Sequence, residues 1–439
     1  MRSFGLLILL LPLFSFSQNH CGESKTKCFK DFFANGSSHG HFRNYFMTTL
    51  GYSGSGDAFA NASGGAIAYR TAEIQGFQLG VMGIFTFNTF SSDLSAGEGG
   101  SWESQLFDVT RPEEKTDLDR LEELFLKYEN HKVRLIIGRF DFDTPLMNPA
   151  DGRMKPYVYS GVGLNYKVKK TFTFGSRFIN NISPRSTTHF HGIGENIGVY
   201  NNGFDHTGNQ NDYHHKVSSD YVWVNSMYWS PKSGFNVEYH NYWLDRININ
   251  HFLSLEREWA KWSLGLEYLN QGKLLGTINQ VYFDNRSNSN VLVGELEKNW
   301  KKWSMALNYS TVFGGKFLFP REFGREAFYG SISRIRLEGK NNVHLMGARQ
   351  EIHFQGKKLK DLEIIAEEAL MMVSDNWKDN KYQESDMVQV NLEMDYHFHN
   401  HLKGMEMKLL FANRFSLQDD LATGVEGFSQ INLITNINF

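Results

Sequence analysis

The sequence predicts an all-β fold, a transmembrane antiparallel β-barrel of about 18 strands with short turns at one rim and long loops at the other. Three observations predict it: alternating apolar and polar residues, aromatic residues at the ends of the alternating segments, and connections that are alternately short and long. Aromatic residues make up 15% of the 439 residues, with 40 Gly and only 8 Pro. Such a mixture favours strands and tight turns over helices.

Charge and hydropathy exclude several other classes of protein. Beyond the extreme N-terminus, no stretch reaches the ~18 apolar residues that a membrane-spanning helix needs. The net charge of −3 gives no basic surface for nucleic acid, and the charged residues are dispersed rather than gathered in a disordered tail. We therefore expect neither a helical membrane protein nor a nucleic-acid-binding protein.

The N-terminus reads as a secretory signal peptide over residues 1–18. Arg2 precedes an apolar run from Leu6 to Phe16, and small polar residues follow it. A lipoprotein anchor at Cys21 would need small residues directly before it, which Gln18-Asn19-His20 does not supply.

Residues 19–38 are expected to form an N-terminal periplasmic segment ahead of the barrel, 39–439. They hold the only two cysteines, Cys21 and Cys28, and an exported polar segment is the setting for one local disulfide. Zinc is the less favoured use of this pair, because two more ligands would have to come from elsewhere.

The body of the chain alternates with the period of a strand that has two different faces. In 388–398, apolar residues interleave with Gln389, Asn391, Glu393, Asp395 and His397. A soluble β-sandwich would alternate in the same way, but its strands average ~5 to 6 residues, whereas a tilted membrane strand needs ~9 to 11. The segments here have the longer length, and rings that suit lipid headgroups lie at their ends: Trp229, Trp262, Trp300, Trp303, Tyr268 and Tyr309.

Eighteen strands are expected, in chain order, at 40–51, 61–72, 76–88, 118–129, 132–142, 157–167, 170–181, 217–230, 234–243, 247–258, 261–271, 289–299, 302–313, 342–353, 361–373, 386–398, 404–417 and 427–439. The connections after even-numbered strands are mostly two or three residues, and the long ones, after odd-numbered strands, are 89–117, 143–156, 182–216, 272–288 and 314–341. A barrel built from hairpins has this asymmetry between its rims.

Three segments leave alternatives open. Residues 114–128 and 358–372 have a Leu and Glu content that also suits a helix, and Ser331–Lys340 reads as one further strand. An even number of strands is favoured, because both ends of the chain should lie at the periplasmic rim.

The chain ends on an amphipathic strand with Phe439 as its last residue. Such an ending resembles the signal that barrel-assembly machinery reads on outer-membrane proteins, although Phe439 could also be one more lipid-facing ring. Lipid bilayer and assembly machinery are thus the expected partners.

Lipid offers no partner to an unpaired backbone group, so the sheet has to close on itself, and 18 strands enclose a lumen too wide to be filled by the wall's own side chains. Charged residues on the polar faces should line it, because at mid-bilayer on the lipid face Arg or Lys would cost ~2 to 4 kcal/mol and acidic residues somewhat less. The expected wall residues are Arg43, Glu123, Lys127, Arg134, Glu238, Glu267, Glu295, Glu297, Glu393, Asp395, Glu406, Lys408 and Arg414.

One loop is a candidate for narrowing that lumen. Residues 143–156 hold three of the eight prolines, which restrict the loop and remove amide donors. An ordinary rigid surface loop is the alternative. Inside the lumen, it would place both signs of charge at a constriction, where a transverse field orients charged or dipolar solutes; the expected constriction residues are Asp143, Asn148, Asp151, Arg153 and Lys155.

These residues resemble the OprD-like outer-membrane porins. The similarity is carried by Arg43-Asn44-Tyr45-Phe46, by 61–69, by Gly138-Arg139-Phe140-Asp141, and by Asp143-Thr144-Pro145-Leu146 and 151–156. It implies an 18-stranded barrel in the outer membrane of a Gram-negative bacterium, with the proline-rich segment as constriction loop. It also implies passive, selective diffusion of small solutes such as amino acids, carboxylates or ions. Arg153 matches the arginine of the family's loop motif.

The chain departs from the family's arginine and lysine ladder. It keeps Lys408 and Arg414 but has Leu410 between them, and the expected wall leans acidic. Cationic, zwitterionic and neutral solutes therefore stay as plausible as anions.

Other functions find weaker support. His397, His399 and His401 share one strand face and could bind a transition metal, although a polar rim is the simpler interpretation. Ser186, His189 and Asp205 have no spacing that demands a hydrolase site. A non-conducting barrel could serve as an adhesin or scaffold through loop 182–216. No cofactor is expected, no enzyme activity is predicted, and the sequence leaves a monomer and a trimer open.

Overall fold

A computed structural model gives the fold and describes residues 25–51, 57–94, 102–111, 114–116, 118–150, 152–200, 203–205, 208–274, 288–354, 361–417 and 427–439. Within these residues the strands form one antiparallel sheet of nineteen, and without the two-residue β8 the barrel wall has eighteen strands. The sheet closes because β1 pairs with β19, with Tyr45 opposite Ile434. The expected barrel, its strand number and its even parity are confirmed.

The wall strands are 8 to 15 residues long. In chain order they are β1 (Ser37–Gly51), β2 (Ala58–Arg70), β3 (Phe77–Ser91), β4 (Arg120–Glu129), β5 (Val133–Phe140), β6 (Val158–Lys169), β7 (Phe172–Ser183), β9 (Val222–Lys232), β10 (Phe235–Leu244), β11 (Asn248–Trp259), β12 (Trp262–Lys273), β13 (Ser289–Asn299), β14 (Trp303–Phe313), β15 (Val343–His353), β16 (Leu362–Met372), β17 (Met387–His397), β18 (Met405–Ser416) and β19 (Phe428–Asn438).

Helical pieces are few; α2 precedes β1, and the others lie in connections between strands. They are α2 (Lys25–Ala34), α3 (Ile193–Asn196), η1 (Trp102–Leu106), η2 (Arg321–Phe323), η3 (Trp377–Asp379) and η4 (Asn400–Leu402), and β8 is His191–Gly192. None of the helices among the described residues is long and apolar enough to cross a bilayer.

The strand alternative holds for both ambiguous segments, because β4 and β16 occupy them. Ser331–Lys340 is not a strand: its apolar side chains Ile332, Ile335 and Leu337 are buried within the barrel among other loop residues. Strand β9 begins five residues later than expected, since Ser219 accepts a hydrogen bond from the Gly194 amide of α3 at 2.9 Å. The chain before Val222 thus packs onto a loop instead of pairing with β7.

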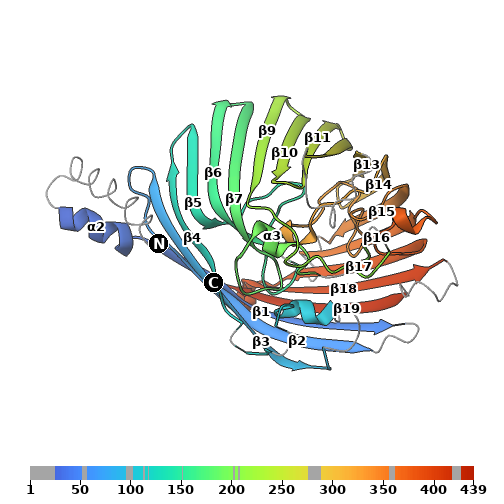
Figure 1. Cartoon of the computed structure of the whole chain (residues 1–439). Coiled ribbons are helices and arrows are strands. Elements are labelled where there is room, and N and C mark those ends of the chain that lie inside the picture. Colours follow the sequence, from blue (N-terminus) through green and yellow to red (C-terminus); the bar gives the residue numbers. More distant parts are fainter. Residues whose placement is uncertain are drawn as a thin grey trace.

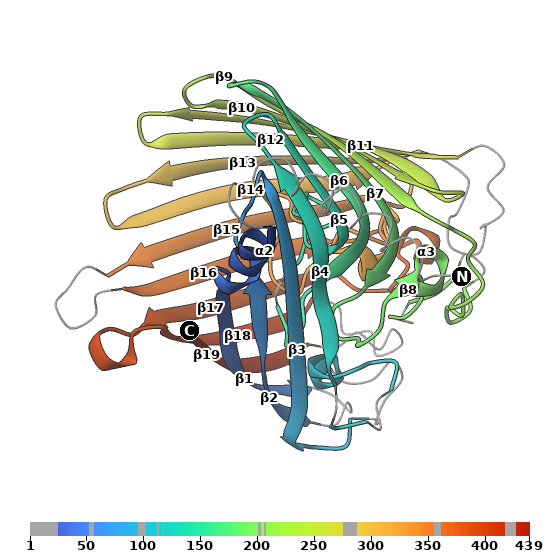
Figure 2. The same ribbon diagram turned by 90° about the vertical axis from the view of Figure 1, so that its left-hand side faces the viewer.

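Short turns gather at one end of the barrel and long loops at the other. Figure 1 shows α3 and the loops beside it inside the ring of strands. Helix α2 lies at the short-turn end, where the Ala72 amide, in the turn after β2, donates to Phe32 O at 2.9 Å (Figure 2). Cys21 lies outside the described residues, as does the Cys28 side chain, so the disulfide stays a prediction, as do the signal peptide and the segment boundaries.

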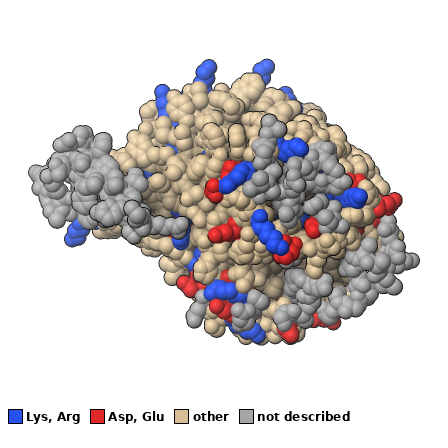
Figure 3. All heavy atoms as spheres, in the orientation of Figure 1, with Lys and Arg blue, Asp and Glu red and all other residues tan. Residues whose placement is uncertain are grey.

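The outer face of the barrel is apolar. Large side chains that alternate with inward polar ones are more than a third exposed, among them Leu266, Leu292, Leu296, Leu307 and Met346. Trp229 and Trp303 lie near the short-turn ends of β9 and β14, as predicted, whereas Tyr268 and Tyr309 lie midway along β12 and β14. All four are about 40% exposed or more. Over the upper part of the face in Figure 3, where β5 to β11 run, charged groups are sparse except at the edge. Such a surface suits hydrocarbon.

Candidate functional site

Two long loops meet inside the barrel. The first, 141–157, is the proline-rich segment, and Leu146, Met147 and Tyr157 in it are at most 1% exposed. The second, 314–342, follows β14, and its residues Phe317 and Phe323 are fully buried. Both belong to one apolar cluster with the lumen-facing side chains of β9 to β15. The expectation that the first loop folds into the lumen is therefore confirmed, and the second was not foreseen.

Hydrogen bonds fasten the two loops together. Asn148 Nδ2 donates to Arg325 O at 2.6 Å, and the Arg325 amide donates back to Asn148 Oδ1 at 3.3 Å. The Ala327 amide donates to Pro145 O at 2.8 Å. Tyr159, at the start of β6, donates from its hydroxyl to Phe323 O at 2.8 Å. Asn148 thus joins two loops by its side-chain amide.

Gly324 permits this close approach. A Cβ at this position would lie 2.4 Å from Leu146 O and 2.9 Å from Met147 Cα. Both atoms are backbone, so no side-chain rotation could relieve the clash. The contact between the loops needs glycine here.

Four arginines gather where the loops converge. They are Arg153 in loop 141–157, Arg185 in loop 184–221, and Arg325 and Arg334 in loop 314–342; we call them the arginine cluster. Arg153 is 2% exposed, and the others are half-buried. Burial, together with the charges of Arg153, Arg185 and Arg325, lowers the pKa of Arg334 to about 9. Among the described residues, no carboxylate pairs with any of the four.

Neutral groups hold the arginine cluster in place. Gln105 of η1 accepts from Arg153 Nη2 at 3.4 Å and from Arg185 Nη2 at 3.3 Å. Gln430 of β19 accepts from Arg334 Nε at 2.7 Å. The Nε atoms of Arg153 and Arg185 have no hydrogen-bond partner. Because amides do not neutralise the guanidinium groups, the cluster keeps a strong local positive potential.

Five carboxylates form an acidic wall on four neighbouring strands: Glu238 on β10, Glu256 on β11, Glu267 on β12, and Glu295 and Glu297 on β13. Each alternates with lipid-facing residues, as Glu267 does with Leu266 and Tyr268. No Lys or Arg forms an ion pair with them among the described residues; Glu238 approaches only His240, at 3.5 Å. Within the described residues, the acidic wall thus has no ion-paired counter-charge along β10–β13.

Loop 314–342 contacts both charged groups. The Tyr329 amide donates to Glu267 Oε2 at 2.9 Å, while Arg325 and Arg334 of the same loop belong to the arginine cluster. Opposite signs of charge therefore border one loop inside the lumen, where a field across the passage would orient a dipolar solute.

The expected constriction residues, and two expected wall residues beside them, have different surroundings. Asp143 of the constriction set and Arg134 of the wall set line one cavity of about 370 Å³ beside Arg177. Lys155 is 1% exposed and its Nζ has no hydrogen-bond partner. Arg43 anchors the loop from β1 by donating from Nη1 to Arg153 O at 2.6 Å. Asp151 lies outside the described residues.

Most other expected wall residues form pairs on the inner face of the barrel. The ion pairs are Glu123 with Arg70 at 3.1 Å, Lys127 with Glu129 at 3.2 Å, Lys408 with Glu393 at 2.6 Å and with Asp395 at 3.0 Å, Glu406 with His397 at 3.5 Å, and Arg414 with Glu384 at 3.6 Å. Pairing leaves this side of the lumen nearly neutral, unlike the acidic wall.

The histidines and the hydrolase residues do not converge on one site among the described residues. His397 faces Glu406, and His399 Nε2 lies 2.8 Å from Asp361 instead. Ser186 is buried with an unpartnered hydroxyl, while His189 bonds to Thr188 at 2.9 Å.

Three solved bacterial structures have the same architecture. Pseudomonas aeruginosa OpdO superposes with a TM-score of 0.71 at 14% identity, covering 94% of this chain and 99% of its own. Acinetobacter baumannii OccAB4 gives 0.72 at 15% identity over 92% and 98%, and P. aeruginosa OccD3 gives 0.69 at 11% over 93% and 92%.

The chain folds as the OprD-like porins do. The resemblance drawn from its sequence motifs is therefore confirmed at the level of the fold. No family model and no curated sequence matches the chain. At 11–15% identity, the likeness establishes architecture alone, so the function has to come from the site.

Proposed function

We propose that the protein is a porin of the Gram-negative outer membrane, which lets small polar or charged solutes such as amino acids, small carboxylates and ions diffuse passively and selectively. One observation carries this proposal: loops 141–157 and 314–342 turn inward and narrow the lumen, while the outer wall stays apolar. A binding scaffold would instead display its long loops outside the barrel.

The charge pattern supports zwitterionic solutes above simple anions. A carboxylate group would be attracted by the arginine cluster, and an ammonium group by the acidic wall along β10–β13. Loop 314–342 reaches both charged groups, because Tyr329 contacts the acidic wall and Arg325 belongs to the arginine cluster. An amino acid carries both groups, so its dipole could align across the passage.

Single-channel recording of the purified protein in a planar bilayer tests the channel. We expect discrete conductance steps, and a barrel that inserts but stays silent would favour the adhesin or scaffold alternative. Swelling of proteoliposomes then tests the solute class, with faster uptake expected for a zwitterionic amino acid than for a neutral sugar of similar size. Equal rates would contradict charge-based selection.

We also propose that Phe439 is the recognition signal for the barrel-assembly machinery. Phe439 is 69% exposed, while its backbone amide donates to Gly40 O at 3.0 Å and is fixed at the β1–β19 seam. The side chain is thus available without any change to the barrel. Phe439→Ala should lower the amount of barrel in the outer membrane and leave refolding in detergent unchanged.

The mass of the detergent-solubilised protein would decide between monomer and trimer.

A further inference from the structure

A histidine and two glutamates meet on the inner face of the β15–β16 hairpin, at the short-turn rim of the barrel. Glu351 and His353 lie two residues apart on β15, so they share a face. Glu363 is the register partner of His353 across the ladder. The same face carries Val343 and Leu345, which pack against the lumen loops, whereas Ile352 is exposed to the outside. The three side chains therefore face the mouth of the lumen.

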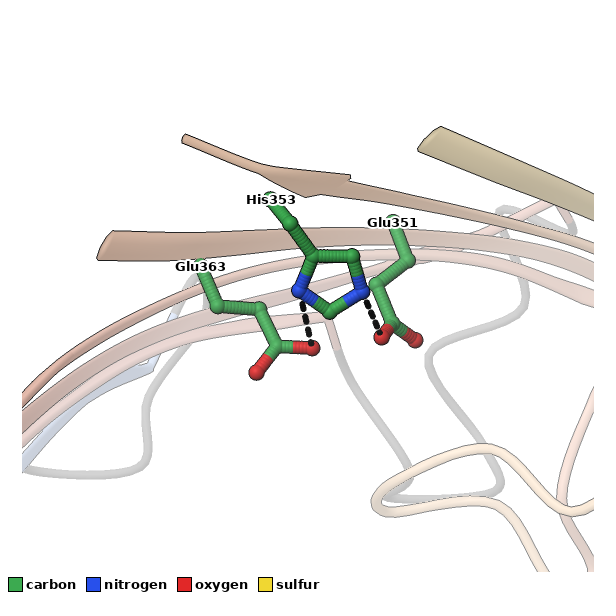
Figure 4. Close-up of side chains that lie close together, drawn as sticks. All are labelled: Glu351, His353 and Glu363. Atoms are coloured by element: carbon green, nitrogen blue, oxygen red, sulfur yellow. Dashed lines mark ion pairs between the residues drawn. The ribbon is translucent and has the colours of Figure 1, made fainter. Parts of the chain in front are cut away.

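Their ligand atoms lie close together, and Figure 4 shows each ring nitrogen of His353 toward one of the two carboxylates. His353 Nε2 lies 2.9 Å from Glu351 Oε1, and Nδ1 lies 3.8 Å from Glu363 Oε1. One atom from each residue lies within 4.8 Å of the other two. Ligands 2.0–2.1 Å from a tetrahedral zinc ion are about 3.3 Å apart. Terminal torsions of His and Glu are broad, so small rotations suffice to bring the three atoms to that spacing.

The surroundings of these residues suit a metal site. Arg349 Nη2 bonds Glu351 Oε2 at 3.0 Å and so orients the carboxylate through the oxygen that does not face the imidazole. The His353 side chain is 53% exposed, which leaves an entry path and room for water as a further ligand. Two paired strands hold all three residues, which limits the reorganisation that binding would require.

We infer that Glu351, His353 and Glu363 bind a divalent transition-metal ion such as Zn²⁺ at the periplasmic mouth of the barrel. One imidazole nitrogen and two carboxylates are N and O ligands of the kind zinc accepts, and three protein ligands leave the fourth position to water. The neighbouring rim histidines differ, because among the described residues His397 faces Glu406 and His399 faces Asp361, one carboxylate each.

Calorimetric titration of the full-length protein in detergent with Zn²⁺ tests the site. One high-affinity site is expected, and His353→Ala should weaken it about tenfold or more, as should Glu363→Gln. His397→Ala is the matched control, since it removes an equally exposed rim histidine that also faces a carboxylate. Unchanged affinity in His353→Ala, or a loss in His397→Ala alone, would overturn the assignment.

This test is independent of conduction. Zinc binding is read from heat, so a barrel that binds zinc but stays electrically silent would contradict the proposed channel and leave the metal site standing. Conversely, normal conductance with no zinc binding by the unmodified protein would reject the site alone.

Discussion

Arg153 places its positive charge where three loops meet, and only neutral oxygens bond its guanidinium. Arg153→Ala should therefore shift ion selectivity toward cations, by about two- to tenfold in permeability ratio, or ~0.4 to 1.4 kcal/mol. The measurement is the reversal potential in a KCl gradient. Arg257→Ala is the control, because Arg257 shares the lipid-facing side of β11 with exposed Leu255. An unchanged reversal potential would remove Arg153 from the selectivity filter.

Lys155 gives a pH dependence of stability. Burial, with the charge of Arg120 adding to it, lowers its pKa from 10.5 to about 7. Because the folded-state pKa is the lower one, the cost of the buried ammonium is fully present below pH 7 and is relieved as the pH rises toward 10. Lys155→Met should raise the free energy of unfolding by about 1–3 kcal/mol at pH 6 and by much less at pH 9.

Thermal unfolding in detergent, followed by circular dichroism at the two pH values, measures this difference. Lys216→Met is the control, since Lys216 is 54% exposed and pairs with Asp212 at 2.6 Å. A gain of equal size at pH 6 and pH 9 would show that packing, and not the charge, is what the substitution changes.

At the residue scale, the sequence predicted which side chains line the wall of the lumen, but it did not predict the arginine cluster inside it. Glu267 and Lys408 could be placed inward because a two-residue period fixes which face each occupies. Arg185, Arg325 and Gln105 lie in irregular loops, where no period relates position to direction. Their convergence depends on contacts between segments far apart in the chain, such as Asn148 with Arg325, which are separated by 177 residues.

At the scale of elements, the sequence of loop 314–342 did indicate that this connection is buried. Phe317, Phe319, Phe323 and Phe328 lie in a connection 29 residues long, where polar residues would be expected. A connection so apolar has to be buried somewhere, and the lumen is the only such place inside a barrel that faces lipid outside. The strands were predictable from alternation. Ser331–Lys340 was wrongly read as a strand because a buried loop can also place apolar residues among polar ones, here Ile332, Ile335 and Leu337.

The contact between the two inward loops gives a prediction of its own. Gly324→Ala should separate them, because a Cβ there would meet backbone atoms of Leu146 and Met147. We expect a larger single-channel conductance and faster proteolysis within 314–342. Gly272→Ala is the matched control, since its nearest neighbour would lie 3.7 Å from the new Cβ, an ordinary contact. Identical conductance in both variants would mean that this contact does not set the width of the passage.

On the scale of the whole molecule, the closure of the sheet is what separates a lipid-facing side from a lumen-facing side on every wall strand. The β1–β19 pairing leaves the wall without a free edge, and every wall strand then has one side toward lipid and one toward the lumen. Neighbouring residues of one strand can therefore differ in environment more than residues on opposite sides of the barrel.

Leu296 and Glu297 on β13 allow a direct test of this separation. Leu296 is 40% exposed on the outer face, and Glu297 belongs to the acidic wall inside. Leu296→Arg should lower the free energy of unfolding in lipid bilayers by up to ~2–4 kcal/mol, less if the position lies near the interface. Glu297→Arg is its control and should change stability by less than about 1 kcal/mol, because the lumen hydrates the new charge, while it shifts selectivity toward anions. Urea titrations in vesicles give both values, and equal losses for the two variants would contradict the assignment of lipid and lumen faces.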